Sequence, residues 1–152
     1  MLKVFVFVVT LAVLGNAQTP QVHCVGCAVG KEKLQCDYYV ARQADRSRQS
    51  LCRRYADYVN IDGAYPKAAW YYLLAGEPKR ALQAADRGID QKQAYAREYR
   101  ALALWLEGDR EAARKELRRF FRQVTPHDYF EKDLATLRRL YPESHLEALK
   151  RR

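Results

Sequence analysis

Four cysteines carry the most distinctive chemistry in the sequence. They are Cys24, Cys27, Cys36 and Cys52, and all four lie in the first third of the chain that follows an apolar N-terminal segment. Cys24 and Cys27 have the two-residue spacing of thiol-redox motifs, and four thiolates are enough for a tetrahedral zinc site. The second close pair typical of zinc sites is missing, and nothing around Cys24 resembles a thioredoxin-like strand and helix. We therefore expect structural disulfides, with no metal and no cofactor.

The pairing of these cysteines depends on the polar stretch of residues 42–50. If one helix runs unbroken through it, Cys36 and Cys52 are about 24 Å apart, which is too far for a disulfide. They would then pair with Cys24 and Cys27, an arrangement that also fastens the irregular lead-in of residues 18–30. A break near Ser47 would instead permit a Cys36–Cys52 disulfide and leave the other two cysteines to close a small ring. We favour the first arrangement.

No set of residues indicates catalysis. His23, His127 and His145 lie in the lead-in or near predicted helix starts, without a serine nucleophile motif or a second histidine on the same helical face. Acidic residues mostly lie beside basic ones at helical spacing, as Glu111 does with Lys115, which is typical of a solvated helix surface. We expect the protein not to be an enzyme.

The chain is basic, with 27 Lys and Arg residues against 18 Asp and Glu and a formal net charge of +9. This charge favours acidic partners, either a protein or an anionic lipid surface. Five basic side chains concentrate on one predicted helix, namely Arg114, Lys115, Arg118, Arg119 and Arg122. This basic stripe is a candidate docking surface, although the solvated outer face of a helix has the same pattern.

The N-terminus has the pattern of an export signal. Residues 1–3 include a positive charge, residues 4–14 are almost wholly apolar, and Gly15, Asn16 and Ala17 provide small residues for cleavage. The apolar run is too short for a permanent anchor. We expect residues 1–17 to be a signal peptide cleaved after Ala17, a periplasmic or secreted location, and no stable membrane insertion afterwards. Export makes nucleic acid the weakest partner, and we expect none.

Helices are predicted to position these residues. Residues 18–60 contain the cysteines and form a lead-in and an N-terminal helical cap, with apolar residues at helical spacing from residue 31. Further along, Gly76-Glu77-Pro78 and Gly108-Asp109-Arg110 lie 32 residues apart. Each glycine permits the left-handed conformation that ends a helix, and the residues after it favour the start of the next one. Each triplet therefore predicts a turn between two helices.

The apolar positions around the two turns also correspond. Ala69, Tyr72 and Leu73 precede the first turn as Ala101, Leu104 and Trp105 precede the second, and the small Ala81 and Ala113 follow them. This pattern, over about residues 65–122, resembles the tetratricopeptide repeat. The resemblance implies an all-α fold, a short right-handed stack of antiparallel helix pairs with a disulfide-stapled N-terminal cap. Two repeats would occupy residues 61–124, and residues 125–152 would form a degenerate third repeat or a C-terminal cap.

The resemblance also implies where a partner binds, because stacked units of this family line a concave groove with the first helix of each pair. The implied groove residues are Trp70, Leu73, Leu74, Tyr95, Glu98, Leu102 and Trp105. Tryptophan at helical spacing also fills cores, which is the competing interpretation. The main functional hypothesis is a non-enzymatic adaptor of the cell envelope that holds a protein or peptide, with acidic character favoured. The alternative is a thiol-redox or metal-binding protein acting through the four cysteines.

Overall fold

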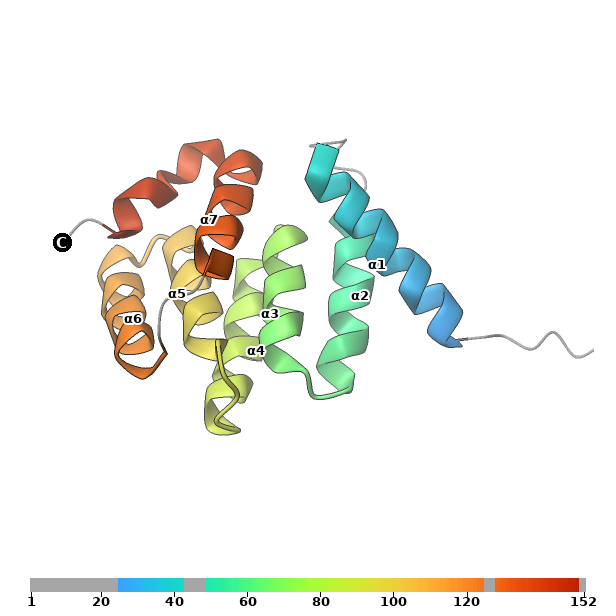
Figure 1. Ribbon diagram of the computed structural model, residues 1–152, viewed down its shortest axis with the longest axis horizontal. Coiled ribbons are helices and arrows are strands. Elements are labelled where there is room, and N and C mark those ends of the chain that lie inside the picture. The colour runs from blue at the N-terminus through green and yellow to red at the C-terminus, as the bar shows by residue number, and fades with distance from the viewer. Residues whose placement is uncertain (1–24, 43–48, 125–127, 151–152) are drawn as a thin grey trace, which may run out of the picture.

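The computed structural model describes residues 25–42, 49–124 and 128–150, and this part of the chain consists of helices joined by short connections, without strands (Figure 1). The elements are α1 (Val25–Arg42), α2 (Gln49–Ile61), α3 (Tyr65–Leu74), α4 (Pro78–Asp90), α5 (Ala96–Leu106), α6 (Arg110–Gln123) and α7 (Asp128–Leu140), followed by the 3-10 helices η2 (Pro142–Ser144) and η3 (Leu146–Lys150). The predicted all-α fold is confirmed. The predicted signal peptide, residues 1–17, lies outside the described residues. No helix in the described part is long and apolar enough to cross a membrane.

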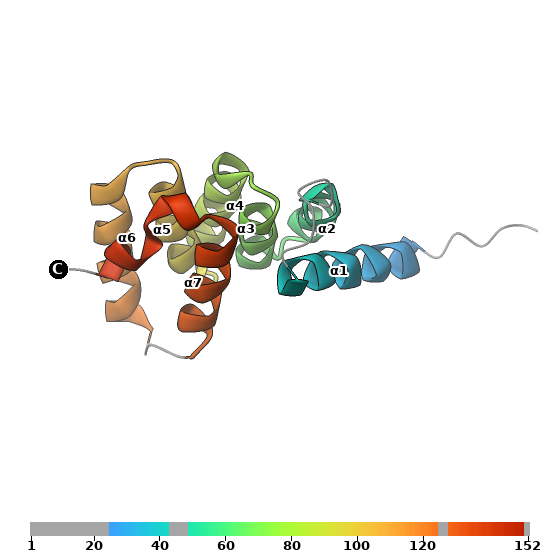
Figure 2. The same cartoon turned by 90° about the horizontal axis from the view of Figure 1, so that it is seen from above.

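Helices that follow one another in sequence pack against one another from α1 to α6. The first helices of the two predicted pairs, α3 and α5, also contact each other directly. Seen from above, α4 lies on one side of this series and α7 on the other (Figure 2). The helices therefore form a row of neighbours in which α3 and α5 present their free side toward α7.

The two glycine turns adopt the predicted conformation. Gly76 has φ +77° and Gly108 has φ +95°, so both occupy the left-handed region that ends a helix. After Gly108, the Asp109 carboxylate accepts a hydrogen bond from the backbone N–H of Ala112 at 3.0 Å and so caps α6. After Gly76, Pro78 occupies the first turn of α4, where its missing N–H is not needed. Both joints arise from local sequence alone.

Small residues allow the paired helices to approach closely. Ala69, Ala81, Ala101 and Ala113 are all fully buried in one continuous apolar core. The closest approach lies at Gly88 in α4, where an added Cβ would come within 2.9 Å of the Cβ of Ala96. A glycine at this late position of α4 is therefore required by the packing of α4 on α5.

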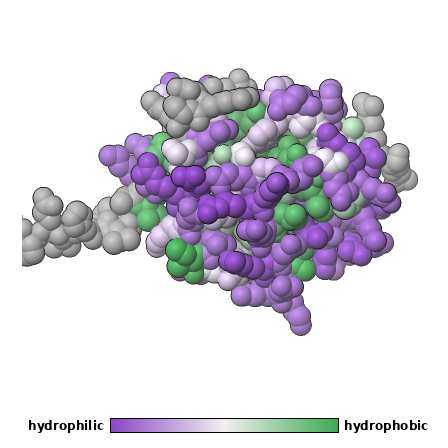
Figure 3. Space-filling model, turned by 180° about the vertical axis from the view of Figure 1, so that it is seen from behind, coloured by the Kyte–Doolittle hydropathy of each residue, from purple (hydrophilic) through white to green (hydrophobic). Residues whose placement is uncertain are grey.

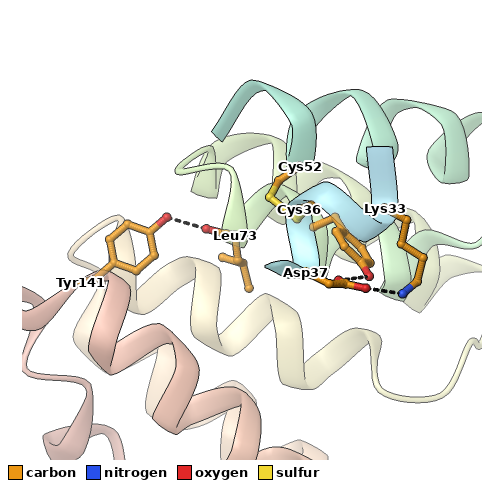
Figure 4. Close-up of a disulfide and its surroundings, with 7 residues drawn as sticks. Lys33, Cys36, Asp37, Cys52, Leu73 and Tyr141 are labelled. Atoms are coloured by element: carbon orange, nitrogen blue, oxygen red, sulfur yellow. Dashed lines mark hydrogen bonds and ion pairs between the residues drawn. A yellow bond between two sulfur atoms is a disulfide. The ribbon is translucent and has the colours of Figure 1, made fainter. Parts of the chain in front are cut away.

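The favoured disulfide pairing is wrong. Cys36 of α1 and Cys52 of α2 form a disulfide with a Cα–Cα distance of 4.9 Å (Figure 4). This distance excludes one unbroken helix from Cys36 to Cys52, and the two cysteines belong to separate elements, α1 ending at Arg42 and α2 beginning at Gln49. The two helices therefore pack side by side, and α1 is further tied to the stack by a 2.9 Å hydrogen bond from the Tyr71 hydroxyl to Asp37. Cys24 and the Cys27 side chain lie outside the described residues.

Peptide mapping tests the disulfide. Trypsin digestion under denaturing, non-reducing conditions should yield peptide 34–42 linked to peptide 49–53. Replacing both cysteines, as Cys36→Ser with Cys52→Ser, should lower the free energy of unfolding by about 3 kcal/mol, the value expected for a loop of this length. Denaturant titration measures this loss in the free energy of unfolding. Finding peptide 34–42 linked to a peptide that contains Cys24 or Cys27 would contradict the structure.

The Gly88→Ala variant tests the close approach of α4 and α5. Alanine normally stabilises a helix interior relative to glycine by about 1 kcal/mol, whereas overpacking a core costs about 1–3 kcal/mol. We expect a net loss of about 1 kcal/mol in the free energy of unfolding, measured by chemical denaturation. Gly30→Ala is the matched control, because Gly30 is also within a helix but has no atom within 4 Å of its added Cβ. That control should be neutral or stabilising.

Candidate functional site

Most of the residues implied to line a groove are buried in the described structure. Leu73 and Leu102 are fully buried, and Leu74, Glu98 and Trp105 are at most 2 % exposed. The competing interpretation, that the tryptophan at this spacing fills the core, therefore holds for Trp105. Only Trp70 and Tyr95 retain appreciable exposure. These five buried side chains do not form an open docking surface.

The chain's own C-terminal segment, α7 with η2 and η3, occupies this side of the stack (Figure 2). The indole N–H of Trp105 donates a hydrogen bond to the backbone oxygen of Ser144 at 2.8 Å. The Tyr141 hydroxyl donates to the backbone oxygen of Leu73 (Figure 4), and the Tyr99 hydroxyl donates to Asp133 at 3.1 Å. Each bond joins the C-terminal segment to α3 or α5.

The C-terminal segment is an integral part of the core. Five of its apolar side chains are at most 4 % exposed, and they are Phe130, Leu134, Leu137, Leu146 and Leu149. The apolar stripe of α7 is visible in the sequence, but its docking site is not, because periodicity shows which face is buried and not what buries it. The covering of α3 and α5 was therefore missed by sequence reasoning.

Trp70 and Tyr95, the two partly exposed members of the implied groove, lie in different environments. The Trp70 ring lies 5.8 Å from the Tyr99 ring, centroid to centroid. Tyr95 has φ +67° at the start of α5, and its ring lies 6.3 Å from that of Phe120 on α6. Tyr95 lines a separate small cleft at the α4–α5 connection together with Phe120. The two aromatic rings therefore do not form one docking patch.

Glu98 is the most unusual ionisable residue in the described part of the chain. Its side chain is 1 % exposed, and neither carboxyl oxygen has a hydrogen-bond partner. Burial, with a further contribution from the negative charge of Asp133 on α7, raises the pKa of Glu98 to about 8. Perturbed carboxyl groups often mark active sites, but this one has no acid–base partner at hydrogen-bond distance. It acts as a source of pH-dependent stability.

The basic stripe on α6 divides into structural and solvent-facing members. Arg114 donates to the backbone oxygen of Ala148 at 3.2 Å and lies 5.3 Å from the Trp105 ring. Arg119 pairs with the buried carboxylate of Glu116 at 3.3 Å. Lys115, by contrast, is exposed. Two members of the stripe thus stabilise the fold and are not available to a partner.

Arg118 and Arg122 lie on the wall of a cleft of about 850 Å³ between α6 and the C-terminal segment. We call this the α6 cleft. It is lined by Arg114, Leu117, Arg118, Phe121 and Arg122 of α6, by Glu131 of α7, and by Leu149 and Lys150 of η3. Four basic side chains therefore surround an apolar lining with one carboxylate. Among the side chains that the structure describes, no carboxylate pairs with Arg118 or Arg122.

The sequence predicted only part of this cleft. Arg114, Arg118 and Arg122 were recognised as a stripe, because they follow one another at one-turn intervals along a single helix. The opposite wall, with Glu131, Leu149 and Lys150, comes from residues distant in sequence and was missed. No local signal joins these residues to α6, since their proximity depends on how the C-terminal segment folds back.

The described cysteines offer no reactive thiolate. Cys36 and Cys52 are joined to each other, so neither is available as a metal ligand or a redox nucleophile in this state. Within residues 25–42, 49–124 and 128–150, no three His, Cys, Asp or Glu side chains come together in a way that could hold a metal ion. The alternative thiol or metal hypothesis would therefore depend on Cys24 and Cys27.

The face of the molecule turned away from α7 is mostly hydrophilic, with hydrophobic residues in separate small patches (Figure 3). This face shows no large apolar docking area among the described residues.

No protein-family model, no curated protein and no solved structure matches the chain. Among the described surfaces, the α6 cleft combines open volume, basic side chains and apolar lining residues.

The stability of the protein should depend on pH through Glu98. The folded pKa of about 8 lies above the ordinary value of 4.5, so stability is fully present below pH 4.5 and falls as the pH rises to about 8. Glu98→Gln should remove this loss and make the variant more stable than the parent at pH 9 by about 2 kcal/mol or more, given about 1.4 kcal/mol per pKa unit.

Thermal and denaturant unfolding at pH 5 and pH 9 measure this difference. At pH 5 the parent and Glu98→Gln should differ much less than at pH 9, because in the folded state both side chains are neutral and similar in shape. Glu107→Gln, at the exposed end of α5, is the matched control and should lose stability between pH 5 and pH 9 as the parent does, because it keeps Glu98. Equal stability of parent and Glu98→Gln at pH 9 would show that folding does not raise the pKa of the Glu98 carboxyl and would contradict the prediction.

Proposed function

We propose that the protein is a non-enzymatic protein–protein interaction module of the cell envelope. Its helix pairs form a tetratricopeptide-like scaffold, and the α6 cleft holds an acidic segment of a protein partner. The export pattern of residues 1–17 supports the compartment. The two left-handed glycines and the contact between α3 and α5 support the repeat-like scaffold.

The observation that carries the proposal concerns Arg118 and Arg122, which line the α6 cleft beside apolar residues. Neither has a carboxylate partner among the described side chains. Arginine binds carboxylates through paired N–H groups, and it does so most favourably where the surroundings exclude water. Phe121, which is 36 % exposed, supplies apolar surface beside these guanidinium groups, and the nearly buried Leu117 and Leu149 also line the cleft. A ligand that combines carboxylates with an aliphatic or aromatic side chain satisfies both features.

A protein segment fits the cleft better than a membrane surface. The cleft is concave and bounded on both sides, by α6 and by the C-terminal segment, so its basic side chains do not form one flat plane. A lipid bilayer presents a flat array of charges, which suits an exposed amphipathic helix. An acidic peptide can enter the cleft and place one apolar side chain on its lining.

The test is peptide binding followed by fluorescence anisotropy at low salt. The probe is a labelled peptide with glutamates on both sides of one phenylalanine, compared with the same peptide carrying glutamines. Replacing Arg118→Gln together with Arg122→Gln should weaken binding of the acidic probe about tenfold, equivalent to about 1.4 kcal/mol. Raising the salt concentration should weaken the parent but change the double variant less.

The matched control removes the same charge on α4, as Lys79→Gln with Arg87→Gln, two exposed positions away from the cleft. It should bind the acidic probe nearly as well as the parent. Equal loss in both double variants would show that net charge alone attracts the peptide and would contradict a specific cleft. Stronger binding to phosphatidylserine vesicles than to the peptide, lost with Arg118 and Arg122, would identify a lipid surface instead.

A further inference from the structure

We infer that Glu131 competes with a partner's carboxylate for Lys150 in the α6 cleft. In the structure of the protein alone, Glu131 binds Lys150 where the partner's carboxylate would bind. The inference rests on the proposed function of the cleft and concerns how the partner enters it. Glu131 projects from α7 and Lys150 from η3, and both line the cleft. Their side chains form an ion pair with each other. The one carboxylate that lines the cleft is therefore already paired with one of the four basic side chains that line it.

The four cations of the cleft are in three different states. Arg114 is fixed by the backbone oxygen of Ala148 and by the Trp105 ring. Lys150 is occupied by Glu131, and its ammonium also lies 5.7 Å from the centre of the Phe130 ring. Arg118 and Arg122 have no carboxylate partner among the described side chains. A partner therefore reaches two cations directly and a third only by displacing Glu131.

Displacing Glu131 from Lys150 costs little free energy, because the ion pair between them is exposed. The Lys150 side chain is 39 % exposed and that of Glu131 is 61 % exposed. Ion pairs in such surroundings contribute little to stability, since water solvates both charges well. A ligand carboxylate can thus take the place of Glu131 without disturbing the buried face of α7, which is formed by Phe130, Leu134 and Leu137.

Glu131 also discriminates between partners. Its negative charge opposes any single carboxylate that approaches the cleft, whereas a segment with several carboxylates gains Arg118 and Arg122 in compensation. Arg118 and Arg122 lie one helical turn apart, which places their Cβ atoms about 5–6 Å from each other. The favoured partner is therefore a densely acidic segment with one apolar side chain, and weakly acidic peptides are rejected.

The test is a double-mutant cycle on Glu131 and Lys150 with the acidic peptide probe defined above. Glu131→Gln should tighten binding about threefold to tenfold, the range expected for one exposed charge. Lys150→Gln should have little effect in the parent, where Glu131 occupies the lysine. In the Glu131→Gln background the same lysine replacement should remove most of the gained affinity. Asp62→Asn, an equal charge change at the exposed α2–α3 connection, is the control and should change binding less than twofold.

The outcomes separate this inference from the proposed function. Peptide binding that depends on Arg118 and Arg122 but is unchanged by Glu131→Gln would overturn the inference that Glu131 competes with the partner. The cleft would remain the binding site. Equal effects of Lys150→Gln in both backgrounds would overturn it in the same way, because the lysine would then be free in the parent. Absence of acidic-peptide binding in the parent and in Glu131→Gln would overturn the proposed function itself.

Discussion

The buried ring of Trp105 is the contact on which the arrangement of the C-terminal segment depends. A buried indole N–H needs an acceptor, and here the acceptor is the backbone oxygen of Ser144, which also accepts a 2.9 Å hydrogen bond from Arg110. The guanidinium carbon of Arg110 lies 4.1 Å from the centre of the ring. One aromatic side chain thus orients an arginine of α6 and fixes the point where the chain turns from η2 into η3.

The same contact determines which surface remains open. Because Trp105 and Arg114 fix the segment near Ser144 and Ala148, residues Leu149 and Lys150 lie across from α6 and complete the second wall of the α6 cleft. The groove side of α3 and α5 is closed by the same fold-back. The face implied by the repeat resemblance is thereby covered, whereas the edge formed by α6 keeps an open cleft.

Charge is distributed so that most arginines near α5 and α6 have structural partners. The buried carboxylate of Glu116 contacts Arg97 at 2.5 Å, Arg119 at 3.3 Å and Arg100 at 3.4 Å, and Arg100 reaches Asp86 of α4 as well. One buried carboxylate surrounded by three guanidinium groups is compensated in full, which a lone buried charge would not be. Arg118 and Arg122 differ from these arginines, because neither has a carboxylate partner among the side chains that the structure describes.

The sequence predicted what local chemistry determines. Gly76 and Gly108 end their helices as expected, because a left-handed glycine is recognisable without knowing what surrounds it. The pairing of Cys36 with Cys52 was not predictable, since a polar stretch is compatible with a solvated helical turn or with a break, and tertiary packing selects between them. The buried state of Leu73, Leu102 and Trp105 was hidden for a related reason. Helical periodicity identified the apolar face, but not the segment that covers it.

Glu98 shows how the closure of the groove side has shaped the energetics of the fold. A glutamate in the first turn of a helix is ordinarily favourable, because its charge complements the helix dipole. Here α7 places Asp133 nearby and excludes water, so the neutral form is favoured instead. The apolar contacts of α7 must outweigh this cost, and they have the size to do so, since five large side chains of the C-terminal segment are nearly inaccessible to water. A docking energy of that kind favours a permanent cover over α3 and α5, which is why we place the proposed partner in the charged α6 cleft and not on the covered face.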